Sequence, residues 1–256
     1  MPPRMREDVP LDMPEPEGSI VPADPQAIEA EMRPVAKRLA ALLRVTPAEA
    51  HWRAAEVGRF SLRQEWRTPD TPCLEFVPRK TAEGVALGLL VDISGSMIKR
   101  MQEVIKALIA FILTCQELED VALEIVAFPG DVHILEYRDR GNARAYERAK
   151  ALTAGLRAGG ETPLECYLPG SIKRLSERPE PRKLLLVIHD GAPDDPEKCE
   201  EQLRRPPVPV WGLFLTETED DPWIEVMREI FWGKLIVGPA SRLDRKLANI
   251  LKGLRM

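Results

Sequence analysis

The sequence predicts an α/β protein with a Rossmann-like, mostly parallel central sheet, one antiparallel edge strand and helices on both faces. Short apolar runs rich in Val, Ile and Leu, such as 85–91 and 183–190, alternate along the chain with segments whose apolar residues recur at helical spacing. Strands that alternate with helices are joined by crossover connections, so they lie parallel and both faces of the sheet are covered.

The composition is that of a globular protein with one sizeable α/β domain and an appendage. The chain has 256 residues, 44% of them hydrophobic, and a formal net charge of -5 that is mixed in sign along the sequence. We therefore expect neither a nucleic-acid partner nor a membrane partner. Without a basic, apolar leader, a cytoplasmic location is expected, where thiols stay reduced. Reduced thiols fit the scattered cysteines, which are Cys73, Cys115, Cys166 and Cys199.

Three regions follow from the pattern along the chain. Residues 1–25 are dense in Pro, Glu and Asp and are expected to form a disordered tail. Residues 26–82 are expected to form a mainly helical N-terminal extension, and residues 83–256 the α/β domain. The elements expected in the extension are an amphipathic helix over 26–44 that bends or shifts around Pro34, helical or mixed structure over 48–66, and a short strand over 74–79 leading into the sheet.

Within the α/β domain, strands and helices are expected in alternation. A buried strand over 85–91 precedes a largely buried helix over 101–118. The turn residues Pro129, Gly130 and Asp131 separate two strand-like runs, which is a hairpin signal and predicts the antiparallel pair. The remaining elements, in order, are strands over 121–128 and 132–137, helices over 144–156 and 164–176, a strand over 183–190, a helix over 195–204, a strand over 208–215, a helix over 222–230, a strand over 234–237 and a helix over 243–254.

The turn after the first strand of the domain carries oxygen-bearing side chains. Asp92, Ser94 and Ser96 occupy alternate positions, and Gly95 loosens the backbone between them. One carboxylate and two hydroxyls can then point toward a single hard cation, which prefers oxygen ligands and keeps some of its waters. Mg²⁺ fits this description, although Asp and Ser are also ordinary residues of helix caps and turns.

Two later segments add to this pattern. Thr162 lies in a glycine-rich loop ahead of a helix, and Asp190 ends a second buried strand. Ligands of parallel sheets bind at the carboxyl ends of the strands, so we expect Asp92 and Asp190 to lie at the same edge.

Together these segments resemble the metal-ion-dependent adhesion site (MIDAS) of von Willebrand factor A (VWA) domains, whose pattern is Asp-x-Ser-x-Ser, then a distant Thr, then a distant Asp. The resemblance implies a VWA fold and a metal shell of Asp92, Ser94, Ser96, Thr162 and Asp190 around Mg²⁺, with Mn²⁺ or Ca²⁺ as alternatives. In such domains the three hydroxyls ligate directly, while the aspartates often act partly through water. A cation with few anionic ligands still attracts a carboxylate from a partner protein.

A narrower resemblance is to the intracellular VWA parts of cobalt chelatase accessory subunits and nitric-oxide-reductase activation proteins. Their Asp-Gly-x-Pro-x-Asp pattern is matched by residues 190–195, whereas His189 stands where a small hydroxyl residue is more usual. This resemblance implies an adaptor, not an enzyme, that works with a MoxR-type or chelatase-type AAA+ ATPase on a client protein. The chain itself has no Gly-x-x-x-x-Gly-Lys-Ser/Thr phosphate loop.

Two other interpretations of the aspartates stay open. In the first, Asp92, Asp190 and a metal ion activate water to hydrolyse a phosphoester. In the second, the cation only neutralises two buried carboxylates and recruits nothing. Two neighbouring features are given structural interpretations: His189 as a strand-end histidine that bonds to backbone, and Lys99 and Arg100 as a solvated helix end.

Overall fold

A six-stranded, mostly parallel sheet forms the centre of the computed structural model, which describes residues 24–43, 58–60, 76–78, 84–118, 120–218 and 220–239. The strand order is β5-β4-β3-β6-β7-β8, and only the edge strand β5 runs antiparallel to its neighbour. This arrangement confirms the predicted fold class. The strands are β3 (Val85–Asp92), β4 (Val121–Phe128), β5 (Val132–Leu135), β6 (Arg182–His189), β7 (Val210–Leu215) and β8 (Leu235–Gly238).

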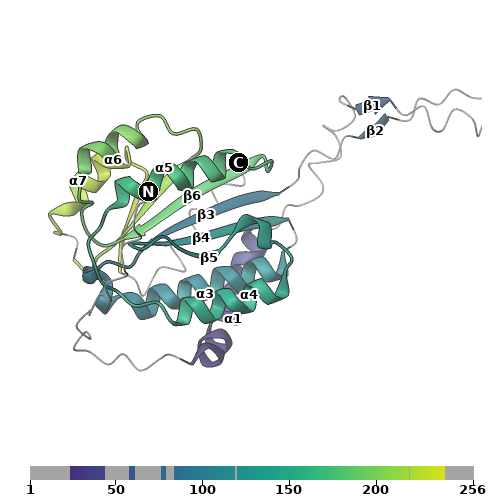
Figure 1. The fold of residues 1–256 in the computed structure, drawn as a ribbon, viewed down its shortest axis with the longest axis horizontal. Helices are drawn as coiled ribbons and strands as arrows, with labels where there is room; N and C mark the ends of the chain where they lie inside the picture. Colours follow the sequence, from purple (N-terminus) through teal and green to yellow (C-terminus); the bar gives the residue numbers. More distant parts are fainter. Residues whose placement is uncertain are drawn as a thin grey trace, which may run out of the picture.

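Helices cover both faces of the sheet (Figure 1). The helices α1, α3 and α4 lie on one face, and α5, α6 and α7 lie on the other. Their bounds are α1 (Pro25–Leu43), α3 (Met101–Glu117), α4 (Ala143–Ala154), α5 (Leu164–Ser176), α6 (Pro196–Leu203) and α7 (Trp223–Ile230), and a 3-10 helix, η3 (Gly95–Lys99), joins β3 to α3.

Strand β3 shows why the central strands are apolar without interruption. Leu87, Leu89 and Val91 face the core beneath α1, α3 and α4, whereas Ala86 and Leu90 face the core beneath α5, α6 and α7. All eight residues of β3 are buried because both faces of the sheet are covered.

Most predicted elements have the predicted type, with shifts of a few residues at their ends. The helix over 164–176 has the predicted bounds, and the hairpin of β4 and β5 turns at residues 129–131, where Gly130 and Asp131 have φ angles of 104° and 52°. Strand β5 ends at Leu135, earlier than expected, because the 3-10 helix η4 (Tyr137–Asp139) begins after it and is capped by reciprocal bonds between Glu136 and Asp139. The expected helix over 243–254 lies outside the described residues.

The N-terminal helix α1 packs onto the α/β domain and contributes to its hydrophobic core. Its buried Ala36 and Leu39 share one hydrophobic cluster with α3 and the sheet. Thr114 of α3 donates a hydrogen bond to the carbonyl of Ala36 at 3.2 Å, which places the two helix backbones close together. Lys150 of α4 adds an ion pair with Glu29 at 2.7 Å. Helix α1 thus forms the outer layer over α3 and α4.

The short strand predicted to lead into the sheet belongs to a separate sheet. Strand β2 (Phe76–Pro78) pairs antiparallel with β1 (Gly58–Phe60), which lies within the stretch expected to be helical or mixed. The predicted connection to the central sheet is therefore wrong for this strand. The signal was three apolar residues, which favour a strand without specifying its neighbour. Residues 1–23 of the expected tail lie outside the part of the chain that is described.

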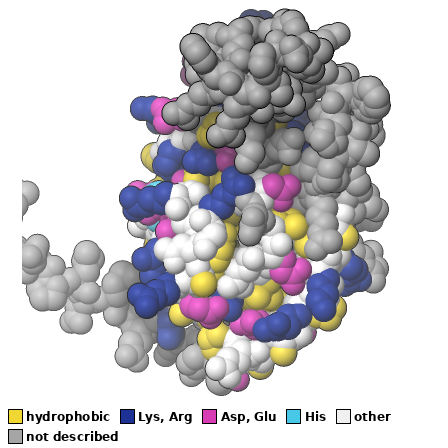
Figure 2. Space-filling view, turned by 90° about the vertical axis from the view of Figure 1, so that its right-hand side faces the viewer, with side chains coloured by type: hydrophobic (Ala, Val, Ile, Leu, Met, Phe, Trp, Pro, Cys, Tyr) yellow, Lys and Arg dark blue, Asp and Glu magenta, His cyan; other side chains and the backbone are white. Residues whose placement is uncertain are grey.

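The surface at the right of Figure 1 carries both signs of charge. Lys and Arg side chains lie among Asp, Glu and apolar side chains on the face shown in Figure 2. Within the described ranges, no helix is both long enough and apolar enough to span a bilayer.

Candidate metal centre

The predicted site lies where the chain reverses its direction of winding through the sheet. Strands β3 and β6 are parallel neighbours, but the chain passes from β3 to β4 on one side and from β6 to β7 on the other. Asp92 is the last residue of β3, and Asp190 directly follows β6. Such a switch point opens a crevice at the carboxyl ends of the strands, where α/β proteins bind their ligands.

A third segment, the loop over 159–162, is tied to the turn after β3 by backbone hydrogen bonds. The amide of Gly159 donates to the carbonyl of Ile93 at 2.7 Å, and the amide of Gly95 donates to the carbonyl of Gly160 at 3.1 Å. Gly160 has a φ angle of 87°, a conformation that favours glycine. The loop is thereby held beside the Asp92 turn.

Asp92 combines complete burial with an unused acceptor. Its side chain is fully buried, and Oδ1 accepts a hydrogen bond from the amide of Ser94 at 2.7 Å. Oδ2 is buried without any hydrogen-bond partner. Burial raises the pKa of Asp92 to about 6 against the opposing effect of the Ser94 hydrogen bond, and the nearby charge of Asp190 raises it further. A buried carboxylate oxygen with no donor is costly unless a cation or proton meets it.

The hydroxyls of Ser94 and Ser96 connect the two strand ends. The Ser96 hydroxyl donates to Oδ1 of Asp190 at 2.5 Å, and Ser94 Oγ lies 3.0 Å from Ser96 Oγ. Because the Ser96 proton goes to Asp190, the Ser94 hydroxyl is the donor in the second bond. Lone pairs on both oxygens then stay open to a cation in the same crevice.

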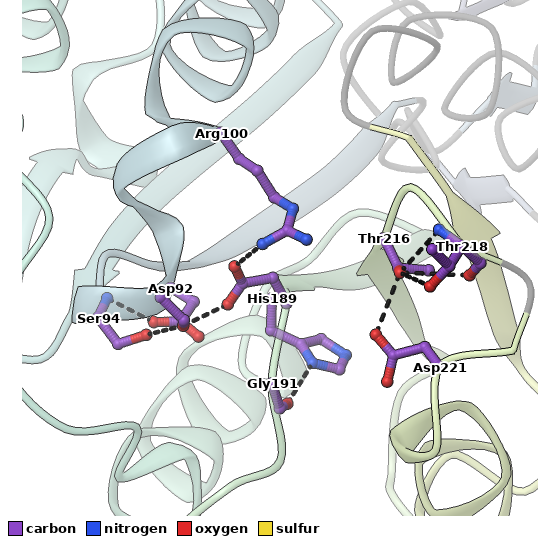
Figure 3. Close-up of polar contacts among 10 residues, drawn as sticks. Asp92, Ser94, Arg100, His189, Gly191, Thr216, Thr218 and Asp221 are labelled. Atoms are coloured by element: carbon purple, nitrogen blue, oxygen red, sulfur yellow. Dashed lines mark hydrogen bonds and ion pairs between the residues drawn. The ribbon is translucent and has the colours of Figure 1, made fainter.

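Arg100 differs from its predicted role as a solvated helix end. Its guanidinium donates from Nη1 to Oδ2 of Asp190, and the side chains of Arg100 and Asp190 are 23% and 0% exposed. Figure 3 shows the Arg100 side chain with this bond as a dashed line. The sequence did not predict this contact, because the two residues are 90 positions apart and Arg side chains are usually exposed to solvent. The sequence hinted at this contact only by placing Arg100 at the start of α3, directly after the turn that carries Asp92, Ser94 and Ser96.

Thr162 is brought to the loop after β6 through its backbone. Its amide donates to Oδ1 of Asp194 at 3.3 Å, and its carbonyl accepts from the amide of Asp194 at 3.1 Å. The structure thus brings all three predicted segments together at one edge of the sheet. Asp194 is an additional residue of this edge, and it occupies a variable position of the Asp-Gly-x-Pro-x-Asp pattern, whose last aspartate is Asp195.

His189 has the structural role expected from the sequence. Its Nδ1–H donates to the carbonyl of Gly191 at 3.1 Å, and its ring packs against Phe214 and Phe231 at centroid distances of 5.3 and 5.6 Å. Complete burial lowers the pKa of the imidazole to about 4, since the charged form would lose its hydration. The neutral ring therefore fills the space between the site and α7.

The donor set at this edge fits a hard cation. Carboxylate and hydroxyl oxygens dominate it, and the partnerless Oδ2 of Asp92 is a ready ligand. Among the residues that the structure describes, no group of three His, Cys, Asp or Glu side chains could hold a metal ion. Any cation here must therefore rely on the serine and threonine hydroxyls together with the two aspartates.

Comparison with known proteins gives no sequence-level relative. No family's sequence model matches the chain, and no curated protein matches it. Solved structures that resemble it include a variant of the PilB minor pilin from Streptococcus sanguinis, with a TM-score of 0.56 and 12% identity over 71% of this chain and 64% of that one. The pilus adhesin SpaC from Lactobacillus rhamnosus GG matches with a TM-score of 0.53 and 15% identity over 68% of this chain.

The chain spans only 30% of the length of SpaC. It covers 95% of the vWF domain of the type V pili tip protein Mfa5 from Porphyromonas gingivalis, with a TM-score of 0.50, 9% identity and 67% of this chain aligned. At identities this low, structural similarity shows only that the fold is shared. The chain therefore has the mixed α/β fold of a von Willebrand factor A domain.

Proposed function

We propose that this chain is a metal-dependent protein-binding module in which Mg²⁺ completes its coordination with an Asp or Glu of a partner protein. The observation that carries the proposal is the buried Oδ2 of Asp92, which has no hydrogen-bond partner and lies at the switch point of the sheet. A bound cation would remove the electrostatic cost of that oxygen.

The residues that would hold the cation are those of the MIDAS pattern. The hydroxyls of Ser94, Ser96 and Thr162 would ligate Mg²⁺, and the aspartates Asp92 and Asp190 would act directly or through water. Bound there, Mg²⁺ supplies a positive centre for an incoming carboxylate. The hydroxyls are neutral, so within this shell only the two aspartates offset the charge of the cation.

The proposed biological role is that of a cytoplasmic adaptor for a MoxR-type AAA+ ATPase and its client. The support for this narrower role is the match of residues 190–195 to the Asp-Gly-x-Pro-x-Asp pattern of intracellular VWA proteins. The sequence lacks a phosphate-binding loop of the P-loop type, so the ATPase partner would supply the energy of remodelling.

Metal-dependent capture of proteins from a native extract tests the proposal. The immobilised chain is exposed to the extract in Mg²⁺ and in EDTA, alongside Ser94→Ala and Thr162→Ala variants. Ser176→Ala is a matched control, since its hydroxyl bonds only to the carbonyl of Lys173 in the described structure, far from the metal loop. We expect one set of proteins retained by wild type and Ser176→Ala in Mg²⁺ and lost in EDTA and in the two site variants.

Retention of the same proteins under all conditions would refute the proposed role of the metal. For a captured partner, Asp→Asn and Glu→Gln substitutions on its surface should identify one acidic residue whose loss abolishes binding. If no single acidic residue matters, the proposed carboxylate contact is wrong.

A further inference from the structure

Both carboxylate oxygens of Asp190 are already engaged by groups of the chain itself. Oδ1 accepts from the Ser96 hydroxyl at 2.5 Å, and Oδ2 accepts from the Arg100 guanidinium. The Asp190 side chain is fully buried, so the ion pair with Arg100 is its main electrostatic compensation. One of the two aspartates at the site is thus neutralised internally, whereas the other, Asp92, has an oxygen without a partner.

The fold fixes Arg100 in this position. Arg100 lies between η3 and α3, where its amide donates to the carbonyl of Met97 at 2.8 Å and its carbonyl accepts from the amides of Glu103 and Val104 at 3.1 Å. The side chain extends from this helix start toward the segment that carries His189 and Gly191 (Figure 3), where it donates to Asp190. Its Nε is buried without a hydrogen-bond partner, so the guanidinium has donor capacity that the chain does not use.

Arg100 places the full positive charge of a guanidinium at the edge of the site. A divalent ion that approaches Asp92 and Asp190 is repelled by the guanidinium and finds Asp190 already paired.

We propose that Arg100 is an internal counter-charge that weakens the binding of free Mg²⁺ and makes retention of the metal depend on the partner's carboxylate. This inference rests on the proposed function and adds a regulatory residue outside the five MIDAS positions. Asp92, Asp190 and Arg100 together carry one net negative charge, and the carboxylate of Asp194 at the same edge is exposed, so solvent screens it. With Mg²⁺ bound, one net positive charge remains, and an Asp or Glu of the partner neutralises it.

The consequence is linkage between the two binding events. A site whose bound metal carries excess positive charge gains more from an incoming carboxylate than a site with two free aspartates, so metal and partner stabilise each other.

Mg²⁺ titrations of the metal-stripped full chain by calorimetry test the inference. The variants Arg100→Gln and Arg100→Met both remove the charge but differ in shape, so if one of them folds poorly the other can still be measured. Arg100→Lys keeps the charge. The matched control is Arg178→Gln. Arg178 has a similarly exposed side chain, 26%, and pairs with the buried Glu180. Glu180 precedes β6 and so lies at the amino-terminal ends of the parallel strands, away from the site.

We expect Arg100→Gln and Arg100→Met to bind Mg²⁺ about tenfold more tightly than wild type, the scale of removing one repulsive charge from a partly solvated site. Arg100→Lys and Arg178→Gln should keep the wild-type affinity. Equal or weaker Mg²⁺ binding in the neutral Arg100 variants, with measurable binding by wild type, would overturn the inference and leave the proposed function intact. Absence of Mg²⁺ binding in the folded wild type and in every variant would overturn both.

Discussion

Asp92 shows how a single buried side chain can favour ligand binding. Strand β3 places it at a fully buried position, its one hydrogen bond from Ser94 uses only Oδ1, and Oδ2 has no donor. Burial favours the protonated acid in the metal-free chain, and a cation would favour the carboxylate. Protons and metal should therefore compete for the same residue.

This competition predicts that Mg²⁺ binding weakens as the pH falls through the raised pKa of Asp92, about 6. At pH 7.5 the carboxylate is almost fully ionised, whereas at pH 5 roughly a tenth of the chains carry it, so the apparent Mg²⁺ affinity should fall about tenfold. Calorimetric titrations at both pH values measure this ratio. An affinity that is constant between pH 7.5 and pH 5 would show that Asp92 is not the residue that the metal requires.

His189 predicts a separate dependence of stability on pH. Burial lowers its folded-state pKa from 6.5 to about 4, so between these values the unfolded chain binds a proton that the folded chain does not. The stabilisation is complete above pH 6.5 and is lost as the pH falls toward 4, by about 3 kcal/mol for this residue.

Urea denaturation of wild type and His189→Gln between pH 7 and pH 4 checks this contribution. The difference in unfolding free energy between the two should shrink with acidity. Phe214→Leu, which alters the same packed cluster without a titrating group, should lose the same free energy at every pH. A pH-independent difference between wild type and His189→Gln would contradict the assignment.

At the scale of elements, the sequence predicted the type of each strand and helix better than it predicted which other element packs or pairs with it. Strand β3 was predictable because residues buried on both faces form a continuous apolar run. The packing of α1 onto α3 was not predictable, since an amphipathic helix reveals that it has a buried face without naming what covers it. The short strand β2 was assigned to the wrong sheet for the same reason.

The packing of α1 leads to a prediction about Leu39, which is 2% exposed in the shared core. Leu39→Ala should lower the unfolding free energy by about 2–4 kcal/mol, because it leaves a cavity between α1 and the domain. Leu152→Ala on α4 is the control, since Leu152 is 40% exposed and should cost well under half as much. Chemical denaturation measures both. Equal, small losses would mean that α1 adds little to the folded domain.

At the scale of the whole molecule, the topology determines where the site lies, and the side chains determine what it can do. The switch point between β3 and β6 could be predicted from the order of strands and helices, and with it the approach of Asp92 to Asp190. The ion pair of Arg100 with Asp190 could not be predicted, because it depends on side-chain directions across 90 positions of sequence. That pair alters the charge of the site, on which its chemistry depends.

The arrangement also predicts that the chain alone does not hydrolyse phosphoesters. Both oxygens of Asp190 are engaged by Ser96 and Arg100, and His189 is fully buried with its ring bonded to Gly191, so neither residue is available to activate water. The open Oδ2 of Asp92 is the oxygen that the proposed cation would occupy. Assays of generic phosphoesters with Mg²⁺ or Mn²⁺ should show no turnover above background. Turnover that disappears in Asp190→Ala would support the hydrolase alternative instead.

The most direct test of the metal-dependent module is a calorimetric titration of Mg²⁺ into the metal-stripped wild-type chain, Asp92→Asn and the control Asp221→Asn. Asp221 lies after β7, the strand next to β6, where it accepts hydrogen bonds from the hydroxyl of Thr216 and from the amide of Trp223. We predict that wild type and Asp221→Asn bind one Mg²⁺ per chain and that Asp92→Asn does not. A folded wild-type chain that binds no Mg²⁺, or an Asp92→Asn variant that binds it equally well, would contradict the account.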